Sequence, residues 1–208
     1  MKYTLLAFAL VLVLLFVSVQ PGRAQSTSVY IGFGTATDSS NGLAIDTFNT
    51  GTFLPTPKMT GLFITLGGEF MFKKHLGFGV ETSWRGGKGL YSGLDYRPTF
   101  YDFNAIWHPV TKKERIVPVI QGGIGGTKVS YYLNQQFCSV FLGCSSSSGL
   151  LGSSSHFQLH AAGGLRLYPK KNVFLEPRLD LRYVPNFFQF GRNIVPEYTI
   201  NLGYTFGQ

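Results

Sequence analysis

The chain has 208 residues, of which 44% are hydrophobic, 15% aromatic and only 13% charged. An average soluble domain carries roughly 25% charged residues. The 26 glycines argue against a helical protein, because glycine weakens helix interiors. These numbers favour one apolar, β-rich domain. The formal charge of +8 does not by itself point to nucleic acid, and we expect no nucleic-acid partner.

The first 24 residues have the pattern of a secretory signal peptide. Lys2 precedes an apolar run from Leu5 to Val17, and small residues at Gly22 and Ala24 suit a signal peptidase. The alternative is a membrane-anchoring helix, but the run is shorter than the roughly 20 residues that a span needs. We expect cleavage after Ala24, which leaves residues 25–208 as the mature domain.

Apolar and polar residues alternate along eight segments of the remaining chain. Side chains of a strand point alternately to its two faces, so this period of two predicts strands with one apolar and one polar face. The predicted strands are residues 26–37, 61–72, 76–85, 99–108, 116–132, 156–168, 173–185 and 197–206.

The connections between these segments alternate in length. Short turns lie at 73–75, 109–115 and 169–172, whereas long connections cover 38–58, 87–97, 133–155 and 185–194. Short turns at one end and long loops at the other are typical of an up-and-down transmembrane barrel. We therefore predict an all-β fold, an eight-stranded antiparallel transmembrane β-barrel, with both chain ends on the periplasmic side.

The segment 173–185 shows what such a barrel requires of its two faces. One face is apolar and would meet lipid, while the other carries charges of both signs and would face the lumen. Buried charges must be paired, so we predict an ion-pair network across the lumen. Its members would be Glu69, Glu81, Arg85, Asp102, Arg166, Glu176, Arg178, Asp180, Arg182 and Glu197. An eight-stranded barrel has room inside for side chains only, and the same face supplies space at Gly32, Gly34, Gly67, Gly77, Gly79, Gly164 and Gly203.

The pattern resembles the small outer-membrane barrels of the OmpA/OmpX type. The most specific part of the resemblance is the last strand, with Tyr198, Ile200, Leu202, Tyr204 and Phe206 on one face. It is similar to the C-terminal signal that the barrel-assembly machinery reads, although here Gly207 and Gln208 follow the terminal aromatic residue. The resemblance implies a bacterial outer-membrane location, outer-membrane lipid as solvent and assembly by that machinery.

Aromatic residues lie near both ends of the predicted strands. Trp84 falls at a long-loop end, whereas Trp107, Tyr204 and Phe206 fall at the short-turn end. These are the heights of the two interfacial aromatic girdles. The alternative is that bulky aromatics are simply good strand formers.

Local features of the strands and loops predict further detail. Cys138 and Cys144 lie close together in a serine-rich stretch of an exported chain, which favours a disulfide over two free thiols. Pro118 and Pro177 fall within predicted strands. Because proline cannot donate to the ladder, we expect a bulge or strand edge near each.

Motifs for catalysis are not apparent. The glycine-rich residues 122–128 lack the Gly-Lys-Ser/Thr order of a phosphate loop. None of the four histidines begins the His-x-Ser motif of lipid A deacylases, and Gly-x-Ser-x-Gly is absent as well. We expect no enzyme, cofactor or metal.

The prediction for function is a monomeric, non-enzymatic barrel that serves envelope structure or surface interaction through its long loops. The loops are poor in charge, which disfavours strong electrostatic capture outside, and the extracellular partner is unknown. The alternatives are a narrow gated pore for small solutes or ions, a lipid A-modifying barrel enzyme, and a soluble lipocalin-like binder with its faces inverted.

Overall fold

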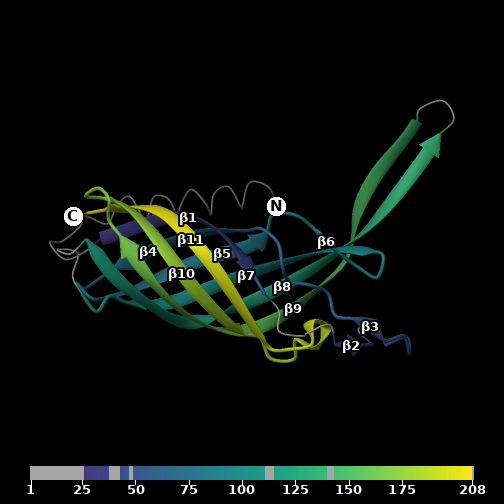
Figure 1. Cartoon of the computed structure of the whole chain (residues 1–208), viewed down its shortest axis with the longest axis horizontal. Helices are drawn as coiled ribbons and strands as arrows, with labels where there is room; N and C mark the ends of the chain where they lie inside the picture. The colour runs from purple at the N-terminus through teal and green to yellow at the C-terminus, as the bar shows by residue number, and fades with distance from the viewer. Residues whose placement is uncertain (1–25, 38–42, 47–48, 111–114, 140–142, 208) are drawn as a thin grey trace, which may run out of the picture.

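The computed structural model describes residues 26–37, 43–46, 49–110, 115–139 and 143–207. Eight long strands form one sheet in which neighbours along the chain pair antiparallel, and the sheet closes through β1–β11 and β5–β7 pairing. The result is the predicted eight-stranded barrel (Figure 1). Its strands are β1 (Ser26–Ala36), β4 (Phe63–Met71), β5 (Leu76–Arg85), β7 (Leu94–Trp107), β8 (Ile116–Ser139), β9 (Gly143–Leu167), β10 (Val173–Tyr183) and β11 (Ile194–Phe206).

The two faces of the wall have opposite chemistry. On β1, Val29, Ile31 and Phe33 point outward and are exposed, whereas Tyr30 is buried inside. The same alternation runs through the other long strands, so large apolar side chains form an outer band and charged side chains fill the interior. A soluble lipocalin-like barrel would need the reverse arrangement.

Short elements gather at the long-loop end of the barrel. They are β2 (Ala44–Ile45), β3 (Leu54–Pro55), β6 (Gly89–Tyr91) and the 3-10 helix η1 (Phe188–Phe190). β6 turns back onto β7 through Ser92 and Gly93, which both have positive φ, as a type I′ hairpin turn requires. Part of the connection predicted at 87–97 is therefore a hairpin.

The long connection predicted at 133–155 is also mostly strand. β8 and β9 stay paired as far as Ser139 and Gly143 and form a ribbon that extends away from the barrel (Figure 1). The serine-rich sequence has no apolar period, but backbone pairing does not require one. The ladder contains an irregularity between Tyr131 and Tyr132.

The two prolines have different effects on the ladder. Pro118 remains opposite Leu165 near the start of β8. On β10, pairing with β9 passes from Leu175–Leu167 directly to Arg178–Gly164. The ladder is therefore interrupted at Pro177, as its missing N–H predicts.

Helices contribute little to the described part of the chain. Across these residues the structure contains no helix with the length and apolarity needed to span a membrane. The predicted signal peptide, residues 1–24, lies outside the described residues, and its cleavage stays a prediction.

Candidate functional site: the lumen and its mouth

Arg182 on β10 links this strand to three others across the middle of the lumen. Its Nη2 lies 2.9 Å from Asp102 Oδ2 and 3.2 Å from Glu81 Oε1, and its Nη1 donates to Glu197. All four residues are buried. Since each guanidinium nitrogen donates to a carboxylate, the geometry offsets part of the cost of burying these charges.

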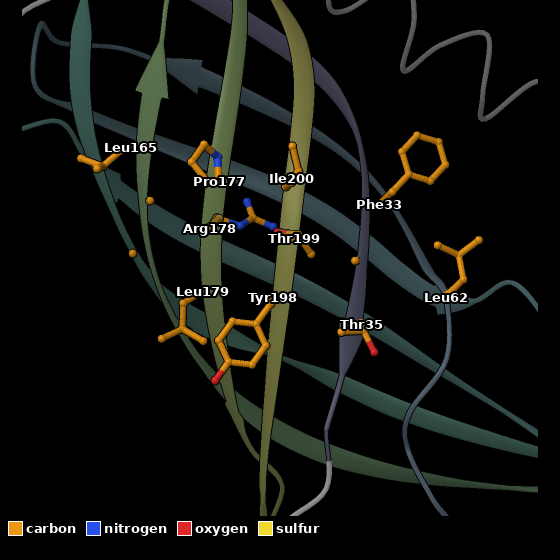
Figure 2. Close-up of a pocket in the computed structure, with 13 residues that line it drawn as sticks. Phe33, Thr35, Leu62, Leu165, Pro177, Arg178, Leu179, Tyr198, Thr199 and Ile200 are labelled. Atoms are coloured by element: carbon orange, nitrogen blue, oxygen red, sulfur yellow. The ribbon is translucent and has the colours of Figure 1, made fainter.

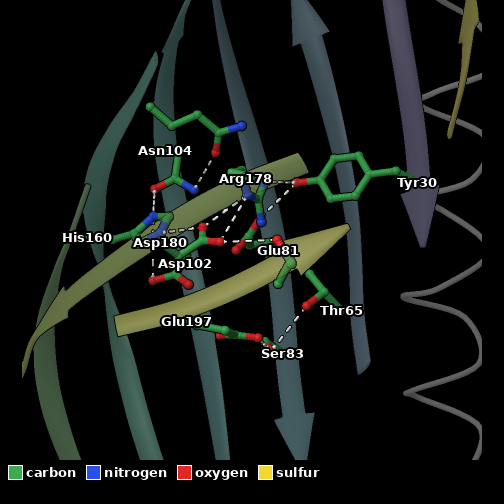
Figure 3. A network of polar contacts seen from close by, with 12 residues as sticks. Tyr30, Thr65, Glu81, Ser83, Asp102, Asn104, His160, Arg178, Asp180 and Glu197 are labelled. Atoms are coloured by element: carbon green, nitrogen blue, oxygen red, sulfur yellow. Dashed lines mark hydrogen bonds and ion pairs between the residues drawn. The ribbon is translucent and has the colours of Figure 1, made fainter. Parts of the chain in front are cut away.

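Arg178 forms a second centre four residues earlier on the same face of β10. Its Nη2 lies 2.7 Å from Glu81 Oε2, and its Nε lies 3.0 Å from Asp180 Oδ1. Tyr30 donates to Glu81 Oε2 at 2.8 Å. Figure 3 shows Arg178 between Glu81, Asp180 and Tyr30, so one guanidinium ties together β1, β5 and β10.

Arg166 on β9 forms the third centre, nearer the short-turn end. Its Nη2 lies 2.8 Å from Glu69 Oε1 and 2.6 Å from Glu176 Oε2. Its guanidinium carbon lies 4.0 Å from the centroid of the Phe174 ring. The ring and the two carboxylates together hold this arginine, which is almost completely buried.

Other polar side chains add hydrogen bonds to several of the acids. Gln158 Nε2 donates to Asp102 Oδ1 at 2.5 Å, and His160 Nε2 lies 3.1 Å from Asp180 Oδ1. Ser83 donates to Glu197 Oε1 at 2.7 Å. Most of the polar groups inside this barrel are thus part of one connected network.

Glu81, His160 and Asp180 form the one cluster of possible metal ligands found among the described residues, with ligand atoms within 4.8 Å of one another. Arg178 already binds both carboxylates, so it supplies the positive charge that a cation would bring. We therefore assign no metal here.

The structure places Arg85 outside this network. Nine of the ten predicted members meet in the lumen, but Arg85 ends β5 at the long-loop end and donates to the Tyr96 hydroxyl at 3.1 Å. Six buried carboxylates therefore surround three arginines and His160.

The mouth, by which we mean the lumen at its long-loop end, is filled by apolar side chains. η1 and its neighbour Phe187 fold over it, and Phe187 stacks on Phe190 with centroids 4.5 Å apart. Phe190 in turn meets the edge of Tyr96. The cluster consists of Ala36, Met59, Phe63, Tyr91, Tyr96, Phe100, Val129, Tyr131, Val184, Phe187, Phe190 and Val195.

A smaller apolar group lies at the opposite end of the lumen. Met71, Ile106 and Val119 are buried together where β4, β7 and β8 approach the short turns. The lumen thus contains an aromatic mouth, an ionic middle and an apolar base. The sequence pattern predicted the middle but did not identify Met59, Phe187 and Phe190, which come from connections without strand periodicity.

The outer wall carries a groove of about 880 Å³ across β9, β10, β11 and β1. Figure 2 shows Phe33 and Leu62 on one side, Leu165 and Leu179 on the other, and Pro177 between them. Arg178 contributes to its lining but is buried and binds acids in the lumen. The groove therefore presents mainly apolar side chains, as a lipid-facing surface does.

The other predicted residues lie on the wall or the ribbon. Trp107, Tyr204 and Phe206 are exposed on the outer face near the short turns, and Trp84 is half-buried near the long loops. Tyr198, Ile200 and Leu202 are also exposed on the outside of β11. The backbones at positions 138 and 144 are opposite each other in the ribbon; the side chains of Cys138 and Cys144 lie outside the described part, so the disulfide stays a prediction.

Closed strand topology, an apolar outer band and an ionic lumen define a small outer-membrane β-barrel. The chain belongs to the outer membrane protein beta-barrel domain family, whose model matches residues 9–206. This membership implies the bacterial outer membrane as its location, with the long loops outside the cell. A search of curated proteins finds no match.

Three solved structures share this fold. Neisserial surface protein A is 15% identical, with a TM-score of 0.56, covering 89% of this chain and 99% of its own. A major outer membrane protein from Thermus thermophilus is 10% identical, with a TM-score of 0.58 and coverage of 88% and 100%. The attachment invasion locus protein Ail of Yersinia pestis is 16% identical, with a TM-score of 0.51 and coverage of 88% and 99%.

Proposed function

We propose that this protein is a non-enzymatic, non-conducting membrane anchor whose working surface is extracellular. The observation that carries the proposal is the filling of the lumen by three successive layers. Eight strands enclose little space, and here long arginines and aromatic rings occupy it. A barrel filled in this way can hold its loops in place without conducting solutes.

The extracellular side offers the surface on which contacts would be made. The β8–β9 ribbon, the β6 hairpin and the segment that carries β2 and β3 all lie at this end (Figure 1). Loops on a rigid scaffold are the usual place for binding residues. The proposed role is therefore envelope structure combined with surface interaction.

Conductance across a planar bilayer tests the proposal. We expect the refolded protein to be silent, and we expect conductance steps when Arg178→Ala and Arg182→Ala are combined, because this removes two buried guanidiniums from the ionic middle of the lumen. Discrete steps from the unsubstituted protein would overturn the proposal in favour of a gated pore. Phe53→Ala, at an exposed extracellular residue, is the matched control and should remain silent.

Biogenesis gives a second part of the proposal. We propose that the outward face of β11 is read by the barrel-assembly machinery and that the finished barrel is monomeric. Tyr204→Ser with Phe206→Ser should reduce the heat-modifiable form in outer-membrane fractions, whereas Phe72→Ser should not. Equal assembly of all variants would contradict a role for the terminal aromatics.

A further inference from the structure

A pocket of about 480 Å³ lies at the extracellular end, apart from the ionic lumen. The segment Leu54–Thr60 forms one side and the β6 hairpin forms the other, with Arg85 and Tyr96 also lining it. It is well within the range of volumes that hold small ligands. The ion-pair network that the structure shows in the lumen does not involve this pocket.

Arg85 is fixed in this pocket without an acidic partner. Each lumen arginine binds two or more carboxylates, whereas no ion pair of Arg85 is found among the described residues. Its Nη1 donates to the Tyr96 hydroxyl at 3.1 Å, and its guanidinium carbon lies 5.5 Å from the centroid of that ring. Tyr96 itself donates to the carbonyl of Lys58. The charge is therefore positioned but not neutralised.

Two glycines leave the space that the guanidinium occupies. A Cβ at Gly89 would lie 2.1 Å from Arg85 Nη1, and a Cβ at Gly61 would lie 2.5 Å from Arg85 Nε. Gly61 also has φ of +147°, which favours glycine. The backbone of β6 and that of the segment before β4 thus lie close around one side chain, as expected for a preorganised charge.

The rest of the lining matches this charge. Among the described residues, the lining includes Arg85 and Lys58 but no carboxylate, and its hydroxyl-bearing residues are Thr56, Thr60, Tyr91, Ser92 and Tyr96. Arginine recognises oxyanions through several directed N–H groups, and hydroxyls and tyrosine rings suit a sugar. Arg85 directly follows Trp84, a residue that we predict to lie near the height of the lipid head groups.

We propose that this pocket binds a sugar unit that carries an oxyanion, with Arg85 as the anion contact. Such a unit is found in the phosphorylated head groups of outer-leaflet lipid and in soluble acidic saccharides. The inference rests on the proposed function in taking the extracellular surface as the working part. A barrel that conducts would overturn the anchor proposal and would leave the binding result intact.

Calorimetric titration of the refolded protein in detergent with glucose 6-phosphate tests the site, with glucose as the neutral control. We expect saturable binding of glucose 6-phosphate and none of glucose. Arg85→Gln should weaken binding at least about tenfold, because it removes a charge-assisted contact. Lys88→Gln is the matched control and should bind normally, since Lys88 already pairs with Asp95 at 3.7 Å.

A second pair of variants keeps every charge and changes only the glycines around the Arg85 guanidinium. Gly89→Ala should weaken binding because its Cβ displaces the guanidinium, whereas Gly87→Ala, which has nothing within 4 Å, should not. No saturable binding at millimolar glucose 6-phosphate overturns the proposal. So does an unchanged affinity of Arg85→Gln, or an equal loss in Lys88→Gln, which would indicate diffuse charge.

Nanodiscs with and without lipid A distinguish the two sources of ligand. If lipid A competes with glucose 6-phosphate for the unsubstituted protein but not for Arg85→Gln, the ligand is a head group of the same membrane. If lipid A does not compete while glucose 6-phosphate still binds, the site takes a soluble acidic sugar. Either result supports an oxyanion-bearing sugar as the ligand.

Discussion

The ionic middle of the lumen and its aromatic mouth are both buried, but they are filled by opposite chemistry. The middle is built from residues on the strands, whose charges meet across the barrel. Removing one charged partner therefore leaves several others without one of their ion pairs. The mouth is built partly from loop residues, including Phe187 and Phe190, which contact one another through rings. We therefore expect the middle to contribute to global stability and the mouth to open locally.

The largest effect is expected from Arg182→Met. It leaves Glu81, Asp102 and Glu197 without their shared guanidinium, and breaking a buried pair costs about 3–5 kcal/mol. Urea unfolding in detergent, followed by heat-modifiability, measures the loss. Arg192→Met is the control, since Arg192 is exposed and should change stability by less than about 0.5 kcal/mol. Equal effects of the two would mean that the network does not stabilise the barrel.

Acid should lower the stability of the folded barrel through His108, which lies at the short-turn end. Burial, helped by nearby Arg166, lowers the pKa of His108 to about 4. Between pH 6.5 and 4 the unfolded chain therefore binds a proton that the folded barrel resists, and stability falls as the pH falls, by up to roughly 3 kcal/mol. Unfolding curves at pH 7 and pH 4 should show a larger loss for the unsubstituted protein than for His108→Gln. Parallel losses would contradict this role.

Two adjacent glycines compare the inside of the wall with its outside. A Cβ at Gly67 would lie 2.2 Å from the Tyr30 ring, whereas one at Gly68 would meet only Ser28 O at 3.7 Å. Gly67→Ala should cost about 1–3 kcal/mol through overpacking, and Gly68→Ala should lie within about 0.5 kcal/mol of the parent. Urea unfolding of both variants measures the difference. A reversed order would show that Tyr30 can move without disturbing Glu81.

The smallest global effect is expected at the mouth. Phe187→Ala with Phe190→Ala should release the segment around η1, so limited proteolysis should cut residues 184–193 faster. The global free energy of unfolding should change less than it does in Arg182→Met, because we expect the segment to open on its own. Phe53→Ala should leave proteolysis unchanged. A global loss as large as that of Arg182→Met would remove the distinction between the two regions.

Sequence periodicity predicted which residues face the lumen, because the period of a strand is fixed by its backbone. It therefore found Glu81, Asp102 and Arg182 without any structure. The sequence did not predict the height of each residue along the barrel axis, since strand tilt and stagger decide which inward residues meet. Arg85 was predicted on the inward face, but it lies too near the long-loop end to reach the ion-pair network. Loop residues such as Phe187 carry no period, and the β8–β9 ribbon gave no apolar signal.

The first and last strands meet through ten residue pairs, from Thr27–Phe206 to Ala36–Glu197. These contacts join positions separated by almost the whole length of the described chain, so they carry a large loop-closure entropy and slow folding. Glu197 reaches Arg182 and Ser83 only after the last strand has arrived. A chain that lacks the last strand would therefore leave Arg182 without one of its three carboxylate partners and would leave the barrel wall open between β1 and β10.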